Sequence, residues 1–170
     1  MLFCMPGLKA QLQVSPILSP DQMVDILVGT GITYSNVQYT SYNQASGKFW
    51  GETNIGMEEG IILTSGKAVN AIGPNSSGST GYDNSGPSDP DLYQMANYSI
   101  EDACILEFDF VPQDNQMRFK YVFASEEYPE FVGGIYNDAF GFFISGPGIS
   151  GDFSNNSDNI AKIPLTNPPV

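Results

Sequence analysis

The segment from residue 125 to residue 143 concentrates oxygen-bearing side chains between two apolar stretches. It contains four carboxylates and one carboxamide, which are Glu126, Glu127, Glu130, Asn137 and Asp138. Carboxylates this close in sequence repel one another, and a bound cation that bridges them relieves the repulsion. Calcium prefers about six to eight oxygen ligands, from carboxylates, carboxamides and backbone carbonyls on flexible loops. The segment therefore has the residue types of a calcium site, with Glu126, Glu127, Asn137 and Asp138 as the expected ligands.

Two other interpretations of this segment stay open. Its spacing does not match an EF-hand loop, and it is equally typical of a solvated loop in which Asn137 and Asp138 form a local turn. It also carries aromatic side chains beside its acids, as expected of a surface that contacts a sugar. The candidate ligand-binding residues are Tyr128, Glu130, Phe131 and Tyr136.

A second, weaker acidic group lies in a long stretch, residues 73–91, that is rich in Gly, Ser, Asn, Asp and Pro. A stretch of this length without regular structure indicates a functional loop or disorder. The group consists of Asp83, Asp89 and Asp91. Asp89 and Asp91 are two residues apart, so they can clamp one ion or cap a helical turn that begins at Leu92. Helix capping alone accounts for one of these two carboxylates, and the metal interpretation keeps both as candidate ligands.

Enzymatic chemistry has little support in the composition. The sequence contains no His, which removes the most frequent general base. It also contains no Gly-x-Ser-x-Gly elbow and no phosphate-binding or dinucleotide-binding fingerprint. A glycosidase needs a pair of carboxyl groups, which the 19 acids do not exclude, but the six basic residues are few for such a cleft. We therefore expect no enzyme, with a glycoside hydrolase as the alternative.

The bulk composition predicts an extracellular, β-rich domain. The 170 residues suit one domain with a hydrophobic core. Only 15% of residues are charged, so much of the surface polarity must come from Ser, Thr, Asn and Gln. The formal net charge of -13 argues against nucleic-acid binding. No later apolar stretch is long enough to span a membrane.

Residues 1–10 have the apolar character of the end of an export signal, and we expect them to be the remnant of a signal peptide. Residues 11–170 are then expected to form a single β domain. Of the two cysteines, Cys4 lies in this leader and Cys104 lies in a strand pattern. We therefore expect no disulfide in the mature chain, with Cys104 as a small buried residue.

One short helix near the N-terminus is predicted just after Ser19. Ser19 is a good N-cap, Pro20 suits the first helical position, and Gln22 completes a capping box. Met23 begins a single apolar face, and Gly29 ends the helix.

Strand patterns dominate the rest of the chain. The expected strands lie in residues 32–42, 49–50, 60–64, 139–145 and 160–170. Residues 106–110 and 117–123 both alternate, and residues 112–115 form a turn signal between them, so we expect a hairpin that pairs Asp109 with Arg118. The predicted fold is mostly β, an antiparallel, jelly-roll-like β-sandwich with one short N-terminal helix.

Several stretches of the sequence resemble the choice-of-anchor L domain family of bacterial exported surface proteins. The most specific are the run from Phe119 to Phe131, which contains Ala-Ser-Glu-Glu-Tyr-Pro-Glu, and the run from Tyr136 to Gly148, which contains Asn-Asp-Ala-Phe-Gly-Phe-Phe. Shorter resemblances lie in residues 60–66, 88–92 and 103–112. The similarity covers nearly all of the chain from Leu18 to Val170.

The resemblance implies a secreted or outer-surface protein, mostly of Bacteroidetes-type bacteria. Such domains stand near the N-terminus of long modular proteins, which end in a type IX secretion signal or a gliding-motility-associated domain. The family domain usually continues further than Val170, so we expect a C-terminal truncation. The resemblance implies no enzymatic activity and no defined ligand.

The expected function is a non-enzymatic secreted or cell-surface module for adhesion or surface assembly, stabilised by calcium. Its expected partners are a surface glycan or protein and the other domains of the parent chain. The alternative is a carbohydrate-binding or glycosidase-like domain, in which aromatic side chains beside the acids would contact the sugar.

Overall fold

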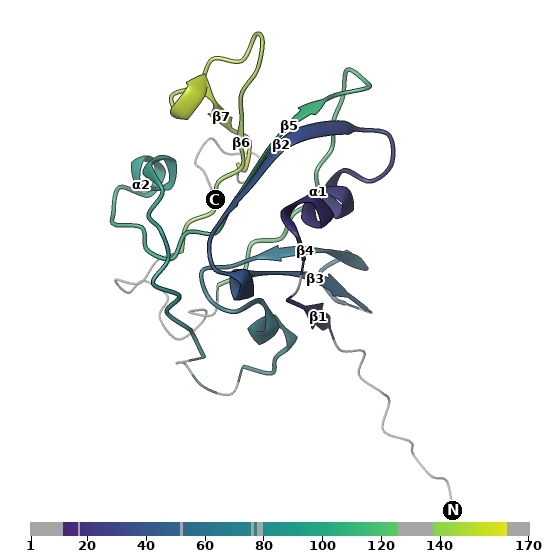
Figure 1. The fold of residues 1–170 in the computed structure, drawn as a ribbon. Coiled ribbons are helices and arrows are strands. Elements are labelled where there is room, and N and C mark those ends of the chain that lie inside the picture. Colours follow the sequence, from purple (N-terminus) through teal and green to yellow (C-terminus); the bar gives the residue numbers. More distant parts are fainter. Residues whose placement is uncertain are drawn as a thin grey trace, which may run out of the picture.

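A computed structural model describes residues 12–16, 18–51, 53–75, 77, 80–125 and 138–162. In this part of the chain, seven strands form three small antiparallel sheets, and two short α-helices accompany them (Figure 1). The mostly β, antiparallel fold class is therefore confirmed. A closed jelly-roll-like sandwich stays a prediction, as do the domain boundaries at residues 10 and 11.

The first sheet has the strand order β1(Gln13–Ser15), β3(Ser46–Trp50), β4(Glu59–Leu63). The strand predicted at residues 60–64 is confirmed. The element expected to begin at residues 49–50 is instead a strand that ends there, and β1 carries no strand signal that we recognised. Gly47 of β3 lies so close to β1 that a Cβ there would be 2.7 Å from the carbonyl oxygen of Ser15. The absence of a side chain at this position thus lets the two backbones approach.

The second sheet pairs β2(Thr33–Thr40) with β5(Ile105–Val111), and this pairing corrects the predicted hairpin. Asp109 lies opposite Ser35 rather than opposite Arg118, and residues 116–125 belong to no strand. The register shifts between Ser35 and Gln38, where Asn36 has a φ of 54° and donates to the Asp109 carboxylate at 2.5 Å. On the solvent-exposed face of the sheet, Asp109 is therefore bonded to the side-chain amide of Asn36 from β2 and not to a basic side chain from the following segment.

The third sheet joins β6(Phe143–Ile144) to β7(Asp158–Asn159). The strand predicted at residues 139–145 is confirmed only at Phe143 and Ile144, near its C-terminal end, because residues 139–142 and 145 are outside the sheet. The Asn159 side chain accepts from the backbone N–H groups of Phe142 and Ala161, both at 3.0 Å. A buried amide therefore replaces part of the ladder that a longer strand would have formed. Residues 163–170 of the last predicted strand lie outside the described residues.

Helix α1(Pro20–Val28) confirms the predicted N-terminal helix and its capping box. The Ser19 hydroxyl accepts from the Gln22 N–H at 3.2 Å, and the Gln22 side chain accepts from the Ser19 N–H at 2.9 Å. Met23 and Val24 are fully buried, because α1 lies between the β2–β5 sheet and the β1–β3–β4 sheet (Figure 1). The helix therefore supplies the largest fully buried side chains among the described residues.

Loss of this cap has a measurable expected cost. We expect Ser19→Ala to lower the free energy of unfolding by about 1 kcal/mol, because the Gln22 N–H loses its acceptor at the positive end of α1. Urea denaturation followed by circular dichroism measures this change. Ser19→Asp is the control, since its carboxylate also accepts from the first turn, and equal losses in both variants would contradict the capping role.

A second helix, α2(Pro90–Ala96), begins two residues before Leu92, where the sequence indicated only the start of a helical turn. It ends at Asn97, whose φ of 59° is left-handed, as is common just after a helix. None of the helices that the structure describes is both long and apolar enough to cross a membrane.

Candidate functional site

Most of the predicted calcium and ligand-binding residues lie outside the described part of the chain. This holds for Glu126, Glu127, Asn137, Tyr128, Glu130, Phe131 and Tyr136. Asp138 is described and is exposed. The calcium site and the aromatic contact surface of this segment therefore stay predictions.

Asp89 and Asp91 of the second acidic group are described, and each accepts hydrogen bonds from the chain. Asp89 is the N-cap of α2 and accepts from the Leu92 N–H at 2.8 Å, so helix capping accounts for this carboxylate. Asp91 accepts from the backbone N–H and the hydroxyl of Ser154, at 3.0 and 2.8 Å. These bonds join α2 to the turn before β7, and no group of three or more His, Cys, Asp or Glu among the described residues is placed to hold a metal.

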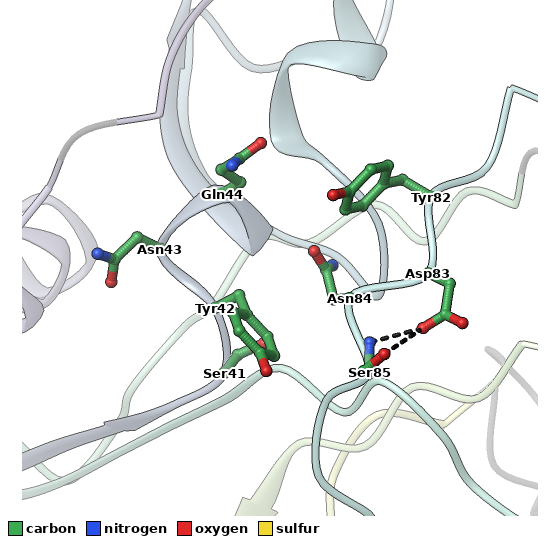
Figure 2. Close-up of a pocket in the computed structure, with 8 residues that line it drawn as sticks. All are labelled: Ser41, Tyr42, Asn43, Gln44, Tyr82, Asp83, Asn84 and Ser85. Atoms are coloured by element: carbon green, nitrogen blue, oxygen red, sulfur yellow. Dashed lines mark hydrogen bonds between the residues drawn. The ribbon is translucent and has the colours of Figure 1, made fainter.

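A polar pocket lies between the end of β2 and the loop that precedes α2 (Figure 2). Its cavity volume is about 490 Å³, within the range of about 300–1,000 Å³ that is typical of small-molecule sites. Two exposed tyrosines stand on its opposite walls, with Asn84 between them (Figure 2). The lining residues are Ser41, Tyr42, Asn43, Gln44, Tyr82, Asp83, Asn84 and Ser85.

The wall formed by residues 82–85 is held by Asp102. Its carboxylate accepts from the Asn84 N–H at 3.1 Å and from the Gly86 N–H in a shorter bond. A Cβ on Gly86 would lie 3.0 Å from the Asp102 Cα, so the close approach of these two segments requires a glycine. One carboxylate therefore fixes two N–H groups of the loop backbone.

The Asn84 side chain anchors the same wall from below. Asn84 is only 7% exposed, and its amide donates to the carbonyl oxygens of Ser65 at 2.5 Å and Gly66 at 2.7 Å. Beside it, Asp83 accepts from the N–H and the hydroxyl of Ser85, which holds Ser85 at a φ of 49°. The polar groups of this wall are thus fixed by bonds within the protein before any ligand arrives.

Tyr82 projects from this wall and is 48% exposed. The Lys67 ammonium lies 3.5 Å from the centroid of its ring, which places a cation on one face. The contact restricts the ring.

The opposite wall, residues 41–44, is held by the end of β2. The Tyr39 hydroxyl donates to the Tyr42 carbonyl at 2.9 Å and lies 3.5 Å from the sulfur of Cys104, the residue just before β5. The Cys104 thiol in turn donates to the Ala45 carbonyl at 3.4 Å, and burial raises its pKa. Cys104 is a free thiol of intermediate exposure rather than the fully buried residue that was expected, and it ties this wall to the β2–β5 sheet.

Two tyrosines of β2 have raised pKa values, which gives a testable pH dependence. A hydrogen bond to the Asp25 carboxylate raises the pKa of Tyr34 to about 12. Burial, followed by the contact with Cys104, raises the pKa of Tyr39 to about 12. Because both folded pKa values exceed the usual value of about 10, the protonated hydroxyls of Tyr34 and Tyr39 stabilise the folded state. Their contribution to the free energy of unfolding is complete below pH ~10 and is lost as the pH rises toward ~12.

Alkaline titration followed by ultraviolet absorbance checks this expectation. We expect Asp25→Asn to return the pKa of Tyr34 toward its usual value while the pKa of Tyr39 stays near 12. A wild-type titration in which every tyrosine ionises near pH ~10 would contradict both assignments.

The sequence analysis left the long stretch at residues 73–91 as either a functional loop or disorder, with Asp83 as a candidate carboxylate, and it did not identify the pocket. No local motif marks Tyr42, Asn43 or Gln44, which lie far from that loop in sequence. The available signal was a cluster of Tyr, Asp, Asn and Ser at residues 82–85 within an otherwise glycine-rich loop.

Comparison with known proteins gives one match. The family model described as the choice-of-anchor L domain matches residues 13–170. No curated protein and no solved structure matches the chain. The match extends over all the elements described above, including both walls of the pocket.

Proposed function

The chain belongs to the choice-of-anchor L domain family, and from this premise we propose that it is a non-enzymatic binding module of the bacterial surface. Its role is adhesion or surface assembly as part of a larger exported protein. The observation that carries the proposal is the polar pocket between residues 41–44 and 82–85, whose walls are held by hydrogen bonds within the protein. A site that is already ordered loses less entropy when a ligand binds, which suits recognition.

The chemistry of this pocket favours binding over catalysis. Asp83 is the one carboxylate among its lining residues, and it accepts from Ser85. A glycosidase acts through two carboxyl groups that flank the scissile bond. The glycoside hydrolase alternative therefore gains no support from the residues that line the pocket.

Surface display is tested on cells that express the complete natural protein. We expect an antibody raised against the purified chain to label intact cells, and added protease to remove the label while a cytoplasmic marker survives. Deletion of the choice-of-anchor L domain from the natural protein is expected to reduce attachment or surface assembly. Label found only after the cells are opened would overturn the proposed location.

We also propose calcium as a stabilising ligand, on the basis of the residue types in the 126–138 segment. At free calcium about 100-fold above its dissociation constant, the expected gain is about 2.7 kcal/mol, or about 5 to 10 °C in the melting temperature. Thermal unfolding with calcium and with chelator measures this shift. Glu127→Gln is expected to abolish it, whereas Asp114→Asn, an exposed turn residue outside the segment, is expected to leave it unchanged. Equal melting temperatures with calcium and with chelator would remove the metal from the proposal.

A further inference from the structure

We infer that the pocket between residues 41–44 and 82–85 binds a neutral saccharide. The inference rests on the proposed binding role and adds the class of ligand and the residues that contact it. The residues that it names differ from those of the aromatic segment at residues 128–136, which the sequence analysis selected.

The two tyrosines supply the apolar part of sugar recognition. Tyr42 is 52% exposed and Tyr82 is 48% exposed, on opposite walls of the pocket (Figure 2). The negative face of an aromatic ring attracts the weakly positive C–H groups on one face of a pyranose. Because Lys67 occupies one face of Tyr82, the inference assigns the sugar to the other face.

The amide groups supply the polar part of recognition. Asn43 and Gln44 are exposed, and neither side chain has a hydrogen-bond partner among the described residues. Each carboxamide presents two donors and one acceptor, which matches sugar hydroxyls that both donate and accept. Figure 2 shows the Asn43 carboxamide directed away from Tyr82 and Asn84, so the polar contact with the sugar is assigned to Gln44.

The charge of the pocket selects a neutral ligand. Asp83 is its single charged lining residue, and the whole chain carries a formal net charge of -13. An anionic polysaccharide would be repelled by this charge. A cationic peptide would find one carboxylate that is already hydrogen-bonded to Ser85, and one face of Tyr82 is already occupied by the Lys67 ammonium.

The test uses the purified chain and a panel of free neutral sugars: glucose, galactose, mannose, N-acetylglucosamine and their disaccharides. Saturation-transfer NMR detects binding, and titration of the amide spectrum gives the affinity. We expect at least one sugar to bind with an affinity that does not depend on ionic strength, because no ion pair is formed. Tyr42→Ala and Tyr82→Ala are each expected to weaken binding about tenfold or more.

Two controls separate loss of the site from loss of the fold. Tyr93→Ala removes a tyrosine of α2 that is 53% exposed and does not line the pocket, so it is expected to leave the affinity unchanged. Tyr82→Phe keeps the ring and is expected to retain most of the affinity. Amide spectra of all variants must match the wild type.

Three results would overturn the inference: no neutral sugar binds, binding survives the double variant of Tyr42 and Tyr82, or only an anionic polysaccharide or a peptide binds. The outcome is independent of the proposed surface location. If the chain is displayed on the surface but binds no sugar, only the saccharide inference is contradicted. If it binds a sugar but stays inside the cell, only the proposed location is contradicted.

Discussion

Asp102→Ala is expected to lower the free energy of unfolding by about 3 kcal/mol and to abolish ligand binding in the polar pocket. The Asp102 carboxylate accepts from the N–H groups of Asn84 and Gly86, so its removal leaves two backbone donors without a charged acceptor. Asp102 also has a φ of 57°, a conformation that costs alanine about 1 kcal/mol more than it costs aspartate. The wall that carries Tyr82 would then lose its main anchor.

Urea denaturation measures the stability of this variant, and sugar titration measures its pocket. Glu101→Ala is the matched control, because it removes the same charge from the adjacent, exposed position. We expect that control to change stability by less than about 0.5 kcal/mol. Asp102→Asn keeps one carbonyl acceptor and tolerates the positive φ, so its loss should be intermediate. Equal stabilities of the Asp102→Ala and Glu101→Ala variants would show that Asp102 does not hold the loop.

Met23→Ala is expected to cost about 3 kcal/mol of unfolding free energy. The Met23 side chain is fully buried where α1 packs between two sheets, so its removal leaves a cavity and forfeits the contacts of the side chain. Leu27 of the same helix is 40% exposed, and Leu27→Ala is expected to cost less than half as much.

Guanidinium or thermal denaturation of both variants checks this difference. Met23→Leu nearly conserves the side-chain volume and should cost less than about 1.5 kcal/mol. If Met23→Ala and Leu27→Ala proved equally destabilising, the inner face of α1 would have to be reassigned.

The features that sequence predicted well are those that neighbouring residues determine. Ser19, Pro20 and Gln22 specify the start of α1 through bonds within one turn, and the structure contains those bonds. The strand at residues 60–64 is likewise marked by a continuous apolar run with a turn signal after it. Such signals require no knowledge of distant partners.

The predicted hairpin was wrong because alternation specifies which face of a strand is buried but not which strand it pairs with. Opposite charges at Asp109 and Arg118 favoured the nearer partner. The actual partner, β2, offers Asn36. Its positive φ and the hydrogen bond from its side-chain amide to the Asp109 carboxylate arise only when the two strands meet. Exposed charge pairs contribute too little to decide such a choice.

The pocket could not be predicted from the sequence, because it too depends on partners that are distant along the chain. Asn84 is an ordinary loop residue in the sequence, and its role depends on the carbonyl oxygens of Ser65 and Gly66 and on the Asp102 carboxylate. Together with Asn84, these groups come from three separated segments. Only the composition of the loop at residues 73–91 indicated that something functional lay there.

The pairing of Thr40 with Ile105 at the end of the β2–β5 sheet affects the order in which the molecule assembles. Both walls of the pocket, and Asp102 with them, lie on the long stretch of chain whose ends this pair brings together. Closing such a stretch costs entropy before any contact within it can compensate, and pairings between distant residues slow folding. The pocket is therefore expected to form late in folding, and a nascent chain that has not yet reached Ile105 cannot close it.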